Sequence, residues 1–207
     1  MKFMSKQTIF LIVIAVIATI GGLLVSNKYY NNEDENSFQA LLEYPIKKTF
    51  SGFELNDHNN NKITIDNFSG KWTLLFFGFT HCPDICPTTL AELQKVFKLI
   101  ETTEKPEVLF VSVDPQRDTP EHLKQYTTYF NPDFNSASAD PANLLSMTSQ
   151  VGVAFHLEEH EADDLNYNVD HTAAIFLVNP DKQLHGIFRI PHDAKKIAMD
   201  LMQLLDK

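Results

Sequence analysis

The two cysteines of the chain, Cys82 and Cys86, stand four residues apart and directly follow the apolar run 72–79. An apolar run of this length is typical of a strand buried on both faces. Pro87 suits the first position of a helix, so the pair lies where a strand passes into a helix. A helix N-terminus lowers the pKa of nearby thiols, and a thiolate is both a soft metal ligand and the nucleophile of disulfide exchange. The pair can therefore grip a metal ion or act as a redox couple.

Further apolar runs and turn residues predict the remaining strands. Asn179-Pro180-Asp181-Lys182 is typical of a turn and joins the last two runs into a hairpin. A polar segment at 56–62 joins the first two runs in the same way. The predicted strands are 53–55, 63–65, 72–79, 108–113, 173–178 and 184–188.

Helices are predicted between these strands. Thr119 before Pro120 and Asp140 before Pro141 are both typical of a cap followed by the first helical residue. The second of these helices should stop near Gly152. Two more helices are indicated by apolar residues at helical spacing, over 90–100 and 197–205.

This order of elements predicts an α/β fold, in which a mixed sheet carries helices on both faces. A cysteine pair at the end of the first buried strand, where the chain enters a helix, is the thioredoxin-like arrangement. Redox pairs of the thioredoxin type have two residues between the cysteines, whereas this chain has three. A four-residue offset on a helix places both side chains on one face, which suits two sulfurs that hold one ion.

The N-terminal segment 8–25 is apolar, carries no charge and is long enough to cross a bilayer as a helix. A cleaved signal peptide is the competing interpretation, but the residues after this segment make a poor cleavage site. Lys2 and Lys6 precede it, so the positive-inside rule places the N-terminus in the cytoplasm. We expect a single-pass protein of the bacterial inner membrane with its soluble domain in the periplasm. The expected parts are a cytoplasmic N-terminus (1–7), a transmembrane anchor (8–25), a flexible tether (26–43) and a thioredoxin-like domain (44–207).

The formal net charge of −10 argues against nucleic acid as a partner. It is compatible with a cationic partner or a metal ion. Two sulfurs alone leave a metal ion under-coordinated, and His171 is the candidate for the third ligand. It precedes the predicted strand 173–178, in the turn where the thioredoxin arrangement places a proline beside the thiols. Asp170 is a candidate acceptor for the ring N–H of His171.

Two other histidine positions are less suited to metal binding. His81 neighbours Cys82, but adjacent side chains that leave a strand point apart. His156 and His160 are four residues apart, yet the glutamates around them favour an exposed polar segment.

Three separated motifs resemble the Sco/SenC family of membrane-anchored copper proteins, which serve the assembly of the CuA centre of cytochrome c oxidase. They are GKWTLLFFGFTHCPDICP at 70–87, SVDPQRDTPE at 112–121 and DHTA at 170–173. The resemblance covers the chain from about Tyr44 onward and includes the N-terminal anchor. It implies that Cys82, Cys86 and His171 are copper ligands. Two thiolates and an imidazole form a soft set that suits Cu(I) and can hold Cu(II), with zinc as the main rival.

The resemblance implies a metallochaperone that delivers copper to the oxidase subunit bearing the CuA site, with a periplasmic copper donor as a further partner. The alternative is an enzyme, a thiol-disulfide reductase that keeps the cysteines of the oxidase reduced. In that role Cys82 would attack and Cys86 would resolve the mixed disulfide. A thiol peroxidase would need a threonine where this chain has Phe79.

Overall fold

The computed structural model describes residues 6–34, 37–102, 104–159, 161 and 164–205. Contacts divide the chain into two units, of which the second is Gln39–Lys207. In the first unit, helix α1 spans Lys6–Asp34. Its part Lys6–Ser26 is the one helix among the described residues with the length and composition to cross a membrane. The helix continues through 27–34, where we expected a flexible tether, because no proline or glycine interrupts its hydrogen bonds there.

The folded unit begins before Tyr44, where we had placed its start. Strand β1 spans Leu41–Thr49, and the residues just before it are held by Asp200. The buried carboxylate of Asp200 accepts hydrogen bonds from the backbone N–H groups of Gln39, Ala40 and Leu41 at 2.7–2.8 Å. The carboxylate thereby joins the first residues of this unit to the last helix.

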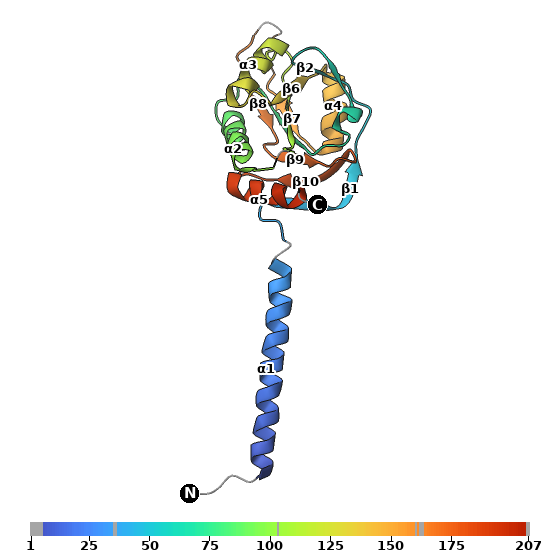
Figure 1. The fold of residues 1–207 in the computed structure, drawn as a ribbon. Helices are drawn as coiled ribbons and strands as arrows, with labels where there is room; N and C mark the ends of the chain where they lie inside the picture. Colours follow the sequence, from blue (N-terminus) through green and yellow to red (C-terminus); the bar gives the residue numbers. More distant parts are fainter. Residues whose placement is uncertain (1–5, 35–36, 103, 160, 162–163, 206–207) are drawn as a thin grey trace. The chain divides into compact units, whose positions relative to one another are not determined.

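One mixed eight-stranded sheet forms the centre of this unit (Figure 1). The strand order is β1-β10-β9-β4-β5-β6-β2-β3. β4 pairs in parallel with β5 and antiparallel with β9, which gives the sheet its mixed character. Besides β1, its strands are β2 (Leu55–Asp57), β3 (Lys62–Ile63), β4 (Thr73–Gly78), β5 (Glu107–Ser112), β6 (Asn135–Ser138), β9 (Ile175–Val178) and β10 (Gln183–Phe188).

The predicted buried strands form the middle of the sheet. Every residue of β4 and of β9 is buried, as the unbroken apolar runs indicated. Phe76 contacts Phe110 at a ring distance of 5.9 Å, and Phe77 contacts Phe176 at 6.1 Å. Since Phe76 and Phe77 are neighbours on one strand, their side chains lie on opposite faces of the sheet. Both faces are therefore packed.

Helices cover both faces, as predicted. Figure 1 shows α2 (Ile85–Leu99), α3 (Pro120–Phe130) and α5 (Ala194–Leu205) on one side of the sheet and α4 (Pro141–Val151) on the other. The predicted caps are confirmed: the Thr119 hydroxyl accepts from the N–H of His122, and the Asp140 carboxylate accepts from two N–H groups of α4. A short 3-10 helix, η1, spans Ile65–Phe68.

Four strands were not predicted from the sequence. β1 and β6 belong to the main sheet, while β7 (Phe155–Leu157) and β8 (Val169–His171) form a separate two-stranded sheet. β6 is the polar sequence Asn-Ser-Ala-Ser. β1 is largely exposed and contains Pro45, so its apolar residues do not form the unbroken run of a buried strand. Their pairing partners, which lie far along the sequence, define these strands.

Candidate metal centre

Cys82 lies in the connection between β4 and α2, and Cys86 is the second residue of α2. The helix begins at Ile85, two residues before Pro87. Pro87 is tolerated there because the N–H groups of the first turn have no intrahelical acceptor, so its missing N–H breaks no helical hydrogen bond. Cys86 therefore lies in the first turn, where backbone N–H groups have no intrahelical acceptor. Its N–H donates to the sulfur of Cys82 at 3.4 Å. The sulfur of Cys82 thus caps the helix, whereas Asp84 makes no side-chain cap bond.

His171 is brought to this helix by the small β7–β8 sheet, in which it pairs with Phe155. Its ring packs edge-on against Phe76 and Phe79 at centroid distances of 6.2 and 5.8 Å. Nδ1 lies 3.2 Å from the carbonyl oxygen of Thr172. Because a carbonyl oxygen only accepts, this bond places the ring proton on Nδ1 and leaves the lone pair on Nε2.

The free nitrogen of His171 faces the thiols, with Nε2 3.2 Å from Sγ of Cys86. The two sulfurs and Nε2 all lie within 4.8 Å of one another. An ion bonded to such atoms at about 2.0–2.3 Å separates its ligands by about 3.5–4 Å. Small side-chain movements would therefore let one ion reach all three atoms. The structure thus brings together the three residues that the sequence singled out.

The two thiols differ sharply in acidity. A hydrogen bond from the Cys86 side chain lowers the pKa of Cys82 to about 4. Burial opposes this shift, and the backbone N–H groups of Cys86 and Asp84 add to it. The same bond to Cys82, together with burial, raises the pKa of Cys86. The pair therefore holds one proton at neutral pH, with the negative charge on Cys82 and the proton on Cys86.

A buried carboxylate holds the loop that leads to Cys82. Asp118 accepts hydrogen bonds from the backbone N–H and the hydroxyl of Thr80, and from the hydroxyl of Ser112. Burial raises the pKa of Asp118, although these three donors oppose the shift. His81 is exposed, and its Nδ1 lies 3.1 Å from the hydroxyl of Thr80. Asp118 thus restrains the residues just before the first thiol.

A second polar network ties the segment before β8 to the end of β5. Arg117 is buried, donates to Asp114 through Nε, and lies 3.7 Å from the ring centroid of Tyr167. Its Nη1 donates to the carbonyl oxygens of Leu165 and Tyr167, and the Tyr167 hydroxyl donates to Asp114. The ion pair at this turn is thus between Arg117 and Asp114, while Asp118 has the separate role described above.

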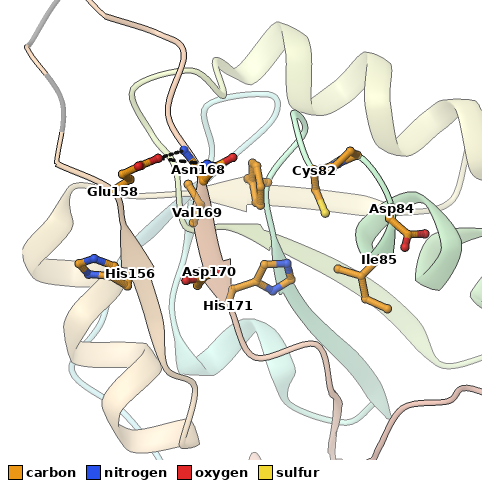
Figure 2. Close-up of a pocket in the computed structure, with 11 residues that line it drawn as sticks. Cys82, Asp84, Ile85, His156, Glu158, Asn168, Val169, Asp170 and His171 are labelled. Atoms are coloured by element: carbon orange, nitrogen blue, oxygen red, sulfur yellow. Dashed lines mark hydrogen bonds between the residues drawn. The ribbon is translucent and has the colours of Figure 1, made fainter.

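A cavity of about 650 Å³ opens beside the thiols. Figure 2 shows Cys82 and His171 pointing into it from two different elements, the loop before α2 and strand β8. On its other side, the Glu158 carboxylate accepts two hydrogen bonds from Asn168. Cys82 is 9% exposed and Cys86 is 0% exposed, so the cavity is the route to the pair.

Some lining residues were not expected from the sequence. His156, in β7, lies opposite Asp170 in the strand register and lines the cavity, while His160 lies outside the described residues. The acceptor for His171 Nδ1 is the carbonyl oxygen of Thr172 and not Asp170, which was the candidate from the sequence. Asp170 and His171 are strand neighbours, so their side chains point to opposite faces. No local signal marks these positions, because the β7–β8 pairing creates them.

A comparison with family models gives one match, described as SCO1/SenC, which covers residues 44–206. The chain belongs to the SCO1/SenC family. A putative copper-binding protein of Stutzerimonas stutzeri is 36% identical over 169 residues, which is 80% of this chain and 81% of that protein. A SCO2-like protein of Rickettsia prowazekii is 30% identical over 198 residues, covering 95% of this chain and 97% of its own length.

Solved structures of this SCO1/SenC family share the fold. Copper-bound ScoI of Bradyrhizobium japonicum superposes with a TM-score of 0.67 at 36% identity, over 75% of this chain and 99% of that one. Copper-bound ScoI of Arabidopsis thaliana gives 0.69 at 30% identity, over 76% and 99%. Apo Sco1 of Thermus thermophilus gives 0.73 at 31% identity, over 81% and 97%. The thioredoxin-like mixed sheet and the family resemblance predicted from the sequence are confirmed.

Proposed function

We propose that this SCO1/SenC protein binds copper through Cys82, Cys86 and His171 and delivers it to the CuA site of cytochrome c oxidase. The observation that carries the proposal is the 3.2 Å distance between His171 Nε2 and the Cys86 sulfur. The other ring nitrogen, Nδ1, is hydrogen-bonded to the carbonyl oxygen of Thr172. Two sulfurs and an imidazole form a soft ligand set, which copper prefers. Relatives with about a third of their residues in common were solved with copper bound.

Delivery requires that the ion can leave. Three protein ligands do not complete a four-coordinate shell, and the cavity beside Cys82 and His171 gives a partner access to the open position. A ligand from the receiving protein can approach through this opening and replace the protein's own ligands one at a time. A periplasmic copper donor would load the site from the same side.

The second candidate function is thiol-disulfide reduction of the oxidase's cysteines. The pKa of about 4 for Cys82, and its position on the cavity wall, suit a nucleophile. Its thiolate would attack the partner disulfide and release one partner thiolate. Cys86 would then lose its proton and displace the second partner sulfur. The partner would be left as a dithiol and this chain with a Cys82–Cys86 disulfide.

We place the protein in the bacterial inner membrane as a single-pass protein with its soluble domain in the periplasm. The apolar part of α1 fits a membrane anchor, and the lysines that precede it favour a cytoplasmic N-terminus. Protease added to intact spheroplasts should then digest the domain Gln39–Lys207. Protection of the domain until the membrane is permeabilised would contradict this orientation.

Delivery and reduction are separated by an experiment with the soluble CuA domain of the oxidase subunit. Copper-loaded wild type should generate the CuA absorption spectrum when mixed with the reduced apo domain, whereas His171→Ala should not. With the oxidised CuA domain and no copper, both proteins would form partner thiols at similar rates if reduction is the function. Thiol formation without any copper transfer by wild type would contradict the delivery proposal.

A further inference from the structure

We propose that Gly78 is a positioning residue for the sulfur of Cys86. It is the last residue of β4 and pairs with Ser112 of β5. A Cβ atom at this position would lie 2.7 Å from Sγ of Cys86, closer than real Cβ contacts occur. The Cys86 sulfur therefore lies in the space that a side chain at position 78 would fill. The consequence for copper depends on the function proposed above, whereas the packing relationship does not.

Backbone conformation does not explain this glycine. The described glycines with positive φ are Gly52, Gly70 and Gly152, and Gly78 is not among them. Its backbone is an ordinary part of the parallel β4–β5 ladder, and its carbonyl oxygen accepts from the N–H of Val113 at 2.9 Å. An alanine could adopt this backbone without strain, so the requirement at this position is for space.

The residues around this space have little room to move. The added Cβ would also lie 2.9 Å from Cε2 of Phe110, a ring that is fully buried. Phe110 is held between Phe76 and Tyr126, with ring distances of 5.9 and 5.7 Å. Cys86 is 0% exposed as well, and its side chain has one rotatable bond that positions the sulfur. A bulkier residue at position 78 would therefore rotate or push the Cys86 sulfur out of its place.

Displacement of this sulfur changes the site directly. Its present position puts Sγ 3.2 Å from His171 Nε2 and within 4.8 Å of the Cys82 sulfur. Because the three ligand atoms lie close enough to share one ion, a shift of one sulfur disturbs the distances to both other ligands. The absence of a side chain at position 78 thus lets the Cys86 sulfur lie where it could share an ion with Cys82 and His171.

The test compares Gly78→Ala with Gly186→Ala in the soluble domain. A Cβ at Gly186 would be equally crowded, 2.7 Å from the carbonyl oxygen of Leu42 and 2.8 Å from Leu41, but its contacts are with β1. Both variants should have a lower Tm than wild type. Chelator competition should show at least a tenfold loss of copper affinity for Gly78→Ala alone, similar to the effect of disturbing a ligand's supporting shell. A folded Gly78→Ala protein with the copper affinity and Cu(II)–thiolate absorption of wild type would overturn the proposal.

A double-mutant cycle tests, without copper, whether Gly78 makes room for the Cys86 sulfur. In a Cys86→Ala background the sulfur is absent, so Gly78→Ala should lower Tm less than it does in wild type. If Gly78→Ala alone does not fold, the double variant should recover a cooperative transition. Equal Tm losses in both backgrounds, or no recovery, would overturn the proposal. If wild type itself fails to bind copper, the proposed function is wrong, and the cycle still decides whether Gly78 positions Cys86.

Discussion

The Nε2 atom of His171 lies 3.2 Å from the sulfur of Cys86, although the two residues are 85 positions apart in the sequence. The thiols are held by the β4–α2 connection, and the imidazole is held by β8, which belongs to a different sheet. An unfolded chain does not keep these groups together, so the binding of an ion to all three is coupled to folding.

Copper should therefore stabilise the reduced soluble domain. A ligand at one hundred times its dissociation constant adds about 2.7 kcal/mol to the free energy of unfolding. For a domain of this size, the corresponding rise in Tm is about 5–10 °C. Thermal unfolding followed by circular dichroism, with and without copper, measures the shift. Cys86→Ser is the control, and an equal rise in that variant would show that the stabilisation comes from another site.

The two thiols should react with iodoacetamide at very different rates in the reduced, metal-free protein. The pKa of Cys82 is lowered to about 4 and its side chain lines the cavity, while Cys86 is fully buried and its pKa is raised. Cys82 should be alkylated first at pH 6, as mass mapping of peptides would report. Equal labelling of both residues, or prior labelling of Cys86, would contradict the assigned thiolate.

Replacing Asp118 by alanine should destabilise the domain by about 2–4 kcal/mol. The change leaves the buried donors of Thr80 and Ser112 without their acceptor, and each such loss costs about 1–3 kcal/mol. Asp118→Asn is the matched control, because its amide oxygen still accepts a hydrogen bond. This variant also removes the buried negative charge, whose desolvation raises the pKa of Asp118. Urea unfolding should rank the asparagine variant clearly above the alanine variant, and identical free energies would contradict the role assigned to this carboxylate.

Much of the fold could be predicted because its signals are local. The continuous apolar run of β4 and the caps at Thr119 and Asp140 reflect burial and hydrogen bonds within a few residues. By contrast, β6 is polar and exists because it pairs with β5 and β2. Such tertiary pairing overrides weak intrinsic preference, so the local sequence does not reveal it.

The candidate site, too, could be predicted only in part from the sequence. The thiol pair is evident from the spacing of Cys82 and Cys86, but spacing cannot show that His171 reaches them. That expectation came from the thioredoxin-like arrangement, in which the turn before strand 173–178 lies beside the thiols, and the family resemblance implied the same residue. The β7–β8 pairing explains how it is met. The space at Gly78 has no sequence signal either, because its need depends on where the Cys86 sulfur lies after folding.

The stability of the domain should depend on pH through His192. Its Nε2 lies 3.0 Å from the carbonyl oxygen of Ala173, and burial lowers the pKa of His192, opposed by that carbonyl and by Glu92. As the pH falls below about 6.5, the unfolded chain takes up a proton at this histidine more readily than the folded chain does. The contribution of His192 to the free energy of unfolding therefore decreases as the pH falls from 7 to 5, whereas the raised pKa of Asp118 acts in the opposite direction.

His192→Gln should reduce this pH dependence. Its amide can still donate to Ala173, but it cannot take up the proton. His58, whose pKa is also lowered by burial, contributes to both proteins alike. Urea unfolding at pH 7 and pH 5 gives the two differences in free energy. The same loss of stability in both proteins would show that His192 does not carry the effect.

The most direct test is a copper titration of the reduced soluble domain that compares wild type, His171→Ala and His156→Ala. His156 lines the same cavity but is not one of the three clustered ligands, so it controls for changes in the cavity wall. We predict that His171→Ala lowers the copper affinity about 100-fold or more. Mutating a residue that only holds a metal ligand in place typically costs ten- to hundredfold, and the loss of a ligand itself should cost more. His156→Ala should bind like wild type, and both variants should remain folded. Equal copper affinity in wild type and a folded His171→Ala protein would contradict the three-ligand site.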